Sequence, residues 1–289
     1  MADAGRPGGP PVFAIASGKG GTGKTFLAVN LALVAGEGTT LVDADAEEPN
    51  GHLFLHPTWE EERPVTVPVP RVDEERCTLC GDCRRACRFN AIALLGGKVL
   101  VYPELCHACG ACLHACPVDA VREEPRAVGA TRLGRRGELR YIQGLVTVGE
   151  ARSTPVIEAV RARAPRGRRV IIDAPPGTTC PTVAAVKGAD YVLLVTEPTP
   201  FGLHDLKLAV AMCRALSLPC GVVINRSGLG SEDTDEFCRA EELPVLARIP
   251  FRRRIAEVVS NGGLAVQEIP EMKEIFAEIL DRMHREARK

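Results

Sequence analysis

The sequence predicts a doubly wound, mostly parallel α/β sheet into which a small α+β domain is inserted. Short apolar runs that end at glycine or aspartate alternate with apolar or amphipathic helical segments, as such a sheet requires. Between residues 77 and 116, eight cysteines form a repeat with the spacing of a metal-binding unit. We therefore expect the sheet domain to occupy residues 1–71 and 123–289, and the insert to occupy residues 72–122.

The composition excludes several classes of protein. The net charge of −1 gives no overall basic field, so we expect no nucleic-acid partner. The start of the chain, residues 1–11, lacks the apolar core of a signal peptide, and no apolar run approaches the ~20 residues of a membrane span. We expect a cytoplasmic protein without stable membrane insertion. In that compartment, 12 cysteines indicate metal or redox chemistry rather than disulfides.

A phosphate-binding loop follows the first expected strand, residues 12–17. The segment GKGGTGKT matches G-x-x-x-x-G-K-[ST] and precedes an apolar helix, which disfavours a plain glycine-rich turn. The glycines let backbone N–H groups and the helix N-terminus face an anion. Lys24 is expected to reach the β and γ phosphates of ATP, and Thr25 to ligate Mg²⁺. The loop consists of Gly18, Lys19, Gly20, Gly21, Thr22, Gly23, Lys24 and Thr25.

Acidic residues end two further expected strands. Residues 39–43 lead to Asp43, with Asp45 two positions later, and residues 170–173 lead to Asp173. Carboxylates at the carboxyl ends of parallel strands lie where an open α/β sheet binds its ligand. One of them is expected to hold the Mg²⁺ shell and another to orient the attacking water. The alternative for each is a simple cap or turn former.

The rest of the chain alternates strand and helix. Residues 123–150 are expected to form a hairpin or linker that returns the chain from the insert. Cys213 and Cys220 are expected to be small core residues, and the apolar face of the last helix to lie on the body. The other expected elements are a helix from Ser153-Thr154-Pro155 to about Arg163, strands at 190–196, 219–224 and 244–249, and a helix at 203–216.

Lys19 has no place in the generic loop pattern, and at this residue the sequence resembles the deviant Walker A ATPases. This family includes the MinD/ParA/Mrp group and the nitrogenase iron protein. The resemblance covers residues 12–56 and about 165–265. It implies the P-loop NTPase fold. It also implies that Lys19 reaches across an interface to the nucleotide of a second copy, which makes a homodimer around ATP.

The same resemblance assigns further residues. It matches Asp43 and Asp45 to the first catalytic switch and Asp173 to the second. It matches Asn225 to an asparagine that contacts adenine, and Pro250 to a loop near the base. We thus expect Mg²⁺-dependent ATP hydrolysis.

The insert contains two copies of C-x2-C-x2-C-x3-C, offset by 29 residues. Three cysteines at intervals of three wrap one cluster, and the fourth is better aimed at the neighbouring one. One [4Fe–4S] cluster is therefore assigned to Cys77, Cys80, Cys83 and Cys116. The other is assigned to Cys87, Cys106, Cys109 and Cys112.

Zinc is the main alternative, but closed Cys₄ zinc sites usually come as two separated C-x2-C pairs. Residues 73–121 are similar to a bacterial two-cluster ferredoxin, except that Arg88 stands where proline is common. We expect this change to raise solvent access near Cys87. Outside the insert, Cys180 follows the second switch. It is expected to be a plain buried thiol, although a cysteine near this position in the nitrogenase iron protein ligates a bridging cluster.

Because the insert lies between the two switches, we expect nucleotide state to be coupled to electron transfer. A redox partner protein or a related ATPase paralogue is then the implied partner. One alternative is a carrier that assembles and transfers clusters, but the C-terminal C-x-x-C usual in Mrp-type ATPases is missing. The other is a regulatory ATPase whose clusters sense redox state.

Overall fold

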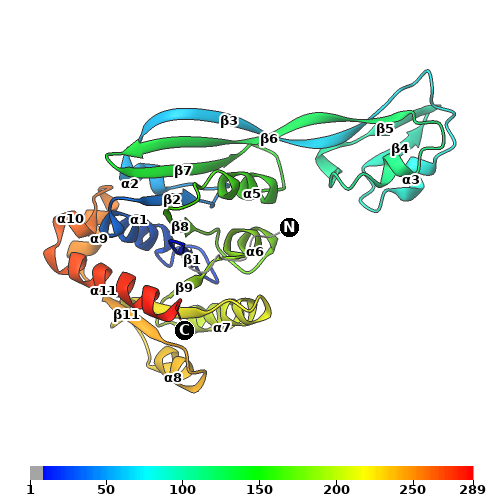
Figure 1. The fold of residues 1–289 in the computed structure, drawn as a ribbon. Coiled ribbons are helices and arrows are strands. Elements are labelled where there is room, and N and C mark those ends of the chain that lie inside the picture. The colour runs from blue at the N-terminus through cyan, green and yellow to red at the C-terminus, as the bar shows by residue number, and fades with distance from the viewer. Residues whose placement is uncertain (1–8, 289) are drawn as a thin grey trace.

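The computed structural model describes residues 9–288, so residues 1–8 at the start of the chain and residue 289 lie outside the described part. A twisted sheet forms the centre of the body (Figure 1). Its strands are β1 (Val12–Ala16), β2 (Thr39–Asp43), β3 (Thr58–Val72), β6 (Val121–Arg136), β7 (Leu139–Val146), β8 (Arg169–Asp173), β9 (Tyr191–Thr196), β10 (Cys220–Ser227) and β11 (Val245–Pro250).

Within the described residues the sheet has nine strands in the order β11-β10-β9-β1-β8-β2-β7-β6-β3. Neighbours from β11 to β7 run parallel, which confirms the predicted mostly parallel sheet. β6 and β3 are added antiparallel at one edge. The central strand β1 therefore delivers the glycine-rich loop to the middle of the carboxyl edge.

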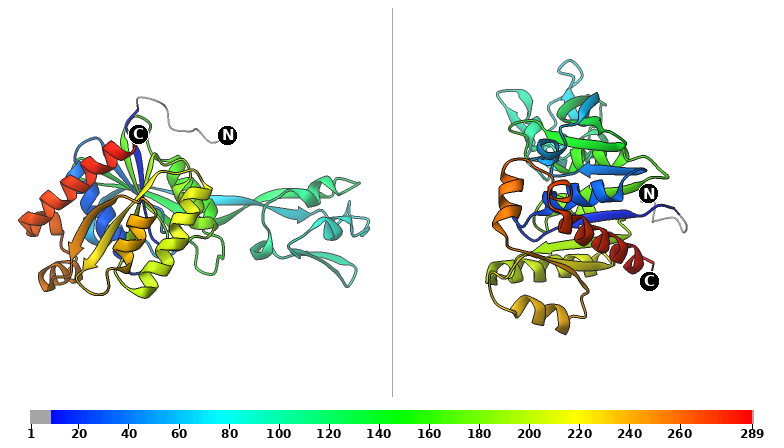
Figure 2. Two further views of the ribbon diagram at one scale, coloured as in Figure 1. Left: turned by 90° about the horizontal axis from the view of Figure 1, so that it is seen from below. Right: turned by 90° about the vertical axis from the view of Figure 1, so that its left-hand side faces the viewer.

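Helices cover both faces of this sheet (Figure 2). One buried core joins the sheet to α5 (Thr154–Ala162), α6 (Cys180–Val186), α7 (Pro200–Ala215) and α8 (Asp233–Ala240). The core of the opposite face joins it to α1 (Lys24–Ala35), α2 (Gly51–Leu55), α9 (Arg253–Ser260), α10 (Ala265–Glu268) and α11 (Pro270–Glu286). Two independent cores of this kind are what a doubly wound sheet needs.

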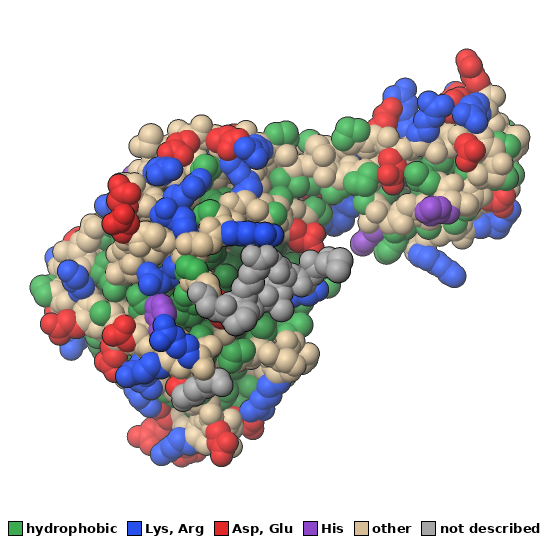
Figure 3. All heavy atoms as spheres, in the orientation of Figure 1, with side chains coloured by type: hydrophobic (Ala, Val, Ile, Leu, Met, Phe, Trp, Pro, Cys, Tyr) green, Lys and Arg blue, Asp and Glu red, His purple; other side chains and the backbone are tan. Residues whose placement is uncertain are grey.

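The insert is carried at the end of a long two-stranded ribbon. β3 and β6 pair from Thr58↔Arg135 out to Val72↔Val121, so the ribbon leaves the body and enters a separate lobe (Figures 1 and 2). The space-filling view shows the ribbon as a narrow neck between body and lobe (Figure 3). The lobe consists of α3 (Asp82–Ala86), β4 (Ile92–Leu95), β5 (Lys98–Val101), the 3-10 turn η1 (Pro103–Leu105) and α4 (Ala111–His114).

The ribbon was predicted only in part. Residues 123–150 do form a hairpin, β6–β7, but its first strand also pairs with β3, which the sequence did not predict. β3 contains Pro64, Pro68 and Pro70, residues that lack a backbone donor and disfavour a strand. They are tolerated because β3 is an edge strand, paired only with β6 among the strands of the described sheet.

The helix termini differ in detail from the predictions. α7 begins at Pro200, three residues before the expected start, because the Thr199 hydroxyl accepts a hydrogen bond from Gly202 N at 3.0 Å. Ser153 occupies the position before α5, but its side chain makes no capping hydrogen bond within the described structure.

The C-terminal helix packs as expected. α11 buries Met272, Phe276, Ile279, Leu280 and Met283 in the core that it shares with α1. Over residues 9–288, every helix is too short or too polar to cross a bilayer.

Candidate functional site

The glycine-rich loop connects β1 to α1 and is held from behind by Asn225. The amide of Asn225, on β10, donates from Nδ2 to the carbonyl oxygen of Thr22 at 2.8 Å. Gly23 has a φ of 97°, and a Cβ at this position would lie 2.5 Å from Asn225 Nδ2. Glycine is therefore required twice, for its left-handed backbone and for the close approach of the amide.

Two carboxylates lie side by side at the carboxyl edge of the sheet. Asp43 on β2 and Asp173 on β8 are direct register partners, and their exposed fractions are 1% and 2%. The Oδ2 atom of Asp43 accepts hydrogen bonds from Gly51 N at 3.0 Å and from the Tyr141 hydroxyl at 2.7 Å. Asp45 follows on the same loop and is half-buried.

Burial makes these acids weak, because it penalises the charged carboxylate. Burial raises the pKa of Asp43 to about 7, although the hydrogen bonds from Tyr141 and Gly51 oppose the shift. Burial and the nearby Asp43 charge raise the pKa of Asp173 well above its usual range, against the opposing effects of Thr25 and Lys24. Burial also raises the pKa of Asp45 to about 6, with Lys24 opposing. Asp45 and Asp173 thus face Lys24, the lysine of the glycine-rich loop.

The site contains polar atoms that have unused bonding capacity. Asp43 Oδ1, Asp173 Oδ1 and Thr22 Oγ1 are buried and find no hydrogen-bond partner among the described residues. Buried polar atoms normally have partners, and unsatisfied ones cost free energy. Carboxylate oxygens of this kind are hard ligands that suit Mg²⁺, alone or through its water shell. The donor set therefore fits the predicted Mg²⁺ and nucleotide phosphates.

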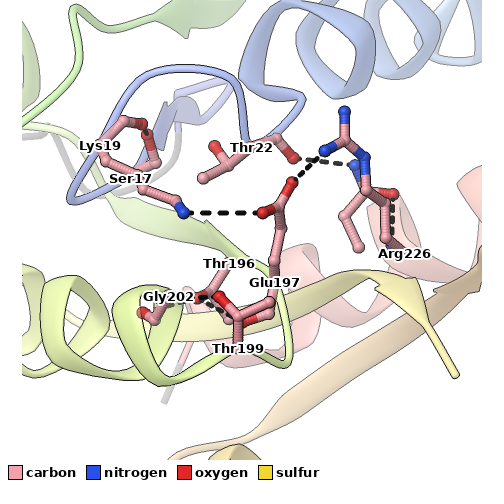
Figure 4. Close-up of polar contacts among 9 residues, drawn as sticks. Ser17, Lys19, Thr22, Thr196, Glu197, Thr199, Gly202 and Arg226 are labelled. Atoms are coloured by element: carbon pink, nitrogen blue, oxygen red, sulfur yellow. Dashed lines mark hydrogen bonds and ion pairs between the residues drawn. The ribbon is translucent and has the colours of Figure 1, made fainter. Parts of the chain in front are cut away.

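Lys19 is bound to an acid of its own chain. Its Nζ lies 3.6 Å from Glu197 Oε2, and Arg226 Nη1 donates to Glu197 Oε1 at 2.6 Å (Figure 4). Glu197, which directly follows β9, is 8% exposed. The carboxylate is thus shared between the loop lysine and an arginine that adjoins Asn225.

The residues expected near the base converge on the ends of two strands. Pro250, the last residue of β11, pairs in register with Ser227 on β10, two positions beyond Asn225. Phe251 N donates to Ser227 O at 3.0 Å, and the Phe251 side chain is exposed. The structure therefore brings Asn225 next to the phosphate loop and Pro250 to the neighbouring strand end.

Two site residues were missed in the sequence. Tyr141 lies in an apolar strand, and Glu197 lies in the segment TEPTP, so neither has a local motif. Their positions depend on strand pairing: β7 adds next to β2, which places Tyr141 against Asp43, and β9 lies next to β1. A polar residue at the end of a buried strand, as at Glu197, is the signal that was available.

The two cysteine repeats have the same backbone. Residues at the same three positions of each repeat have positive φ, and two of the three pairs are not glycine. They are Leu79 and Ala108 (57° and 52°), Gly81 and Gly110 (78° and 71°), and Asn90 and Asp119 (55° and 51°). The repeats also exchange equivalent hydrogen bonds, Asp73 N to Ala120 O and Tyr102 N to Ala91 O, each 2.8 Å. The insert is therefore pseudo-symmetric.

The thiols fall into the two predicted groups. Cys87, Cys106, Cys109 and Cys112 line one pocket together with Phe89 and His107, whose rings stack with centroids 3.7 Å apart. Cys77, Cys80 and Cys116 are the thiols that lie close enough to Cys83 to raise its pKa, after burial. Each fourth cysteine thus lies with the other repeat.

Backbone amides point at the sulfur atoms. Ala91 N lies 3.3 Å from Cys87 Sγ, and at the equivalent position Ala120 N lies 3.2 Å from Cys116 Sγ. Ala108 N donates to Cys106 Sγ at 3.4 Å. Over residues 9–288, no group of three or more His, Cys, Asp or Glu side chains converges to hold a single metal ion. Cys87 and Cys116 are both half-buried.

The cysteines outside the insert give one correction. Cys180, expected to be buried, is exposed at the first position of α6. Cys213 is fully buried as expected, and the neighbouring Cys220 thiol and burial raise the pKa of Cys213.

Residues 13–265 match the family described as CobQ/CobB/MinD/ParA nucleotide binding domain. The uncharacterized protein MJ0579 of Methanocaldococcus jannaschii is 28% identical over 267 residues, which cover 87% of this chain and 90% of that one. The cytosolic Fe-S cluster assembly factor Nubp2 homolog of Anopheles gambiae is 29% identical over 123 residues, 35% of this chain and 46% of its own. MinD of Pyrococcus horikoshii, solved with Mg-ADP, superposes with a TM-score of 0.57 at 21% identity and 94% and 95% coverage of the two chains, which shows a shared fold.

Proposed function

Because the chain belongs to the CobQ/CobB/MinD/ParA nucleotide-binding family, we propose that it is a Mg²⁺-dependent ATPase that couples its nucleotide state to electron transfer through two [4Fe–4S] clusters. The nucleotide half of this proposal is supported by the geometry around Lys24. Asp45 and Asp173 face this lysine at the carboxyl edge of the sheet, and the Thr25 hydroxyl interacts with Asp173. The Pyrococcus protein, which shares the fold, was solved with Mg-ADP.

Each residue of the nucleotide site has a role in this proposal. The loop from Gly18 to Thr25 binds the phosphates, and Lys24 neutralises the β and γ groups. Thr25 and Asp43 would hold the Mg²⁺ ion, which supplies positive charge to the phosphates, and Asp173 would orient the attacking water. Asp45 adds a further carboxyl group near Lys24.

In this proposal, a homodimer gives Lys19 its function. Released from Glu197, its ammonium group would extend toward the nucleotide of a second copy, where a positive charge stabilises the transition state of phosphoryl transfer. Asn225 and Pro250 would adjoin the base.

One observation carries the cluster half of the proposal: each fourth cysteine lies with the three cysteines of the other repeat. This exchange is the ligand pattern of two-cluster ferredoxins. A cubane binds its four thiolates on four different irons, whereas zinc needs all donors about 2.3 Å from one point. The exchange of the fourth cysteine between the repeats therefore fits a pair of clusters better than a closed zinc site. When bound, each cluster supplies a one-electron carrier.

The protein supplies hydrogen bonds and shielding to this site. Amides of Ala91, Ala108 and Ala120 donate to sulfur, and such bonds stabilise the extra negative charge of a reduced cluster. The stacked rings of Phe89 and His107 cover part of the pocket that Cys87 lines.

A second candidate is a carrier that delivers clusters to other proteins. The similarity to the Nubp2 homolog, a cluster assembly factor by name, favours it over 35% of this chain. The two functions differ in whether iron leaves the protein. Incubation of the loaded protein with an apo-ferredoxin would transfer iron if the carrier function holds and would leave it bound if electron transfer holds.

The test of the proposal is metal analysis with spectroscopy on anaerobically purified full-length protein. We expect about eight iron and eight sulfide per chain, two interacting [4Fe–4S] signals by EPR after dithionite reduction, and Mg²⁺-dependent ATP hydrolysis. Stoichiometric zinc without sulfide would overturn the cluster half. Failure to bind Mg-ATP by calorimetry would overturn the nucleotide half.

A further inference from the structure

The loop between β7 and α5, residues 147–153, contacts the insert directly. Arg152 donates from Nη1 to the carbonyl oxygen of Cys106, at the start of the second cysteine repeat. Arg152 belongs to the body, immediately before α5, and Cys106 lies 46 positions away in the chain. This contact joins the two parts of the molecule outside the ribbon.

A buried ion-pair network fixes the arginine. Glu150, whose side chain is 1% exposed, accepts from Arg152 Nε at 2.8 Å and from Arg126 Nη1 on β6 at 2.5 Å. Arg152 N also donates to Glu150 Oε1 at 3.2 Å. Charge-assisted hydrogen bonds of this kind are short and directional, and a carboxylate with two arginines has one preferred geometry.

The start of the same loop is hydrogen-bonded to the segment that follows Asp45. Val146 N, at the end of β7, donates to Ala46 O at 2.9 Å, and Ala46 directly follows Asp45. Thr147 N donates to Val128 O at 3.0 Å, and Thr147 O accepts from Glu150 N at 2.9 Å. Hydrogen bonds and short covalent steps thus run without interruption from the segment after Asp45 to Cys106.

The start of the second repeat is packed in the core that the ribbon shares with the body. Cys106 is buried in the large core that contains Val65, Val67 and Val128 of the ribbon. Its counterpart Cys77 is half-buried and is not part of this core among the described residues. Movement of the 147–153 loop would therefore act on the Cys106 loop through a direct contact.

From this geometry we propose that Glu150 and Arg152 transmit the nucleotide state of the switch after Asp45 to the Cys106–Cys112 loop. The inference rests on the nucleotide binding proposed above, and it holds whatever group the cysteines carry. Arg152 is a positioning residue, since it contacts neither the phosphate loop nor a thiol. Filling the site next to Asp43 and Asp45 shifts the backbone at Ala46, and the network moves the Cys106 carbonyl with it.

Hydrogen exchange of the full-length protein, with and without Mg-ATP, tests this connection. In the unaltered chain, nucleotide should change the exchange rate of amides 106–112 by about threefold or more. Arg152→Ala should reduce this change to below about 1.5-fold, while calorimetry shows Mg-ATP affinity within about twofold of the unaltered chain. Arg71→Ala is the matched control, because it removes an exposed ribbon arginine paired with Glu124 and should leave the response intact.

The design separates a switch from a static tether. If Arg152 merely anchors the lobe, Arg152→Ala will raise exchange at 106–112 equally in both states and leave the nucleotide-dependent difference unchanged, which overturns the proposal. The absence of any nucleotide response in the unaltered chain overturns it as well. Glu150→Gln is the second variant, and it should weaken the response without removing the Arg152 side chain.

Iron analysis and calorimetry of the same samples distinguish this failure from failure of the proposed function. If the chain binds Mg-ATP and about eight iron and eight sulfide per chain but its amides 106–112 do not respond to nucleotide, only the proposed role of Glu150 and Arg152 fails. If the chain lacks clusters but its amides 106–112 still respond to Mg-ATP, the cluster half of the proposed function fails and the role of Glu150 and Arg152 stands.

Discussion

The nucleotide site and the cysteine insert are held in place by different means. The site is fixed by parallel strand pairing between two large cores, so Asp43, Asp173 and the phosphate loop are positioned without ligand. At the centre of the insert, the small buried cluster consists of Cys83, Ile92, Cys112 and Val121, and half of it is cysteine. Small domains without a sufficient core depend on metal or disulfide staples. The body is thus preformed, whereas the insert depends on its thiols.

The largest effect is expected from breaking the insert. Cys109→Ser replaces an exposed thiol, a change that costs within ±0.5 kcal/mol if the side chain does nothing more. Because a bound cluster contributes folding free energy, its loss should unfold the lobe and speed proteolysis between residues 72 and 122 by roughly 100-fold. Limited proteolysis followed by mass spectrometry measures this.

Cys180→Ser is the control for this variant, since it changes an equally exposed thiol in the body. If the lobe of Cys109→Ser resists protease as well as that of Cys180→Ser, the dependence on thiols is refuted.

The next largest effect is expected from a variant that disrupts the nucleotide site and leaves the insert unchanged. Lys24 is 6% exposed and faces Asp45 and Asp173, so Lys24→Ala should weaken Mg-ATP binding by roughly 100-fold, about 2.7 kcal/mol. Calorimetry gives the affinity, and the EPR signals of the insert should be unchanged.

Lys19→Ala sharpens the same comparison. Because Lys19 is assigned to the nucleotide of a second copy, its removal should leave binding within a few-fold and abolish hydrolysis. A loss of affinity equal to that of Lys24→Ala would place both lysines on the same nucleotide.

A third effect is the pH dependence of the empty body. The folded-state pKa of Asp43 is about 7, above the ordinary 3.8. Protonated Asp43 therefore favours the folded state at low pH, and this contribution is lost as the pH rises from about 4 through 7. Between pH 5.5 and 8, Asp43 should cost about 2 kcal/mol of unfolding free energy. Urea denaturation of the chain and of Asp43→Asn isolates this contribution, which the variant should lack.

Bound Mg-ATP should flatten the same profile, because the cation compensates the carboxylates. A chain that becomes more stable than Asp43→Asn as pH rises would contradict the assigned environment of Asp43.

The smallest effect concerns the ion pair of Lys19. The pair is partly exposed and 3.6 Å long, which limits it to about 1 kcal/mol, or about fivefold. Glu197→Gln should therefore strengthen ATP-dependent dimerisation by about twofold to fivefold in sedimentation experiments. Arg226→Ala removes the competing partner of Glu197 and should act in the opposite direction. Changes of the same sign in both variants would exclude Glu197 as the residue that restrains Lys19.

The sequence predicted the parts of the site that are encoded locally. Glycine spacing predicted the loop after β1, and apolar runs ending in aspartate predicted that Asp43 and Asp173 lie together at the carboxyl edge of the sheet. The ribbon was not predicted, because Pro64, Pro68 and Pro70 disfavour a strand and only the edge position makes them acceptable. Tyr141 and Glu197 acquire their roles through pairing between distant strands, which no local pattern encodes. The exposure of Cys180 was wrongly predicted for the same reason, since tertiary packing determines which end of α6 is covered.

The most direct test of the central claim is an EPR-monitored redox titration of the anaerobic protein with and without Mg-ATP. Coupling predicts that the midpoint potential of one cluster shifts on nucleotide binding. By linkage, the affinity for Mg-ATP should then differ about fivefold or more between oxidised and reduced protein. Two clusters whose potentials are indifferent to nucleotide, in a protein that binds Mg-ATP equally well in both redox states, would contradict the account.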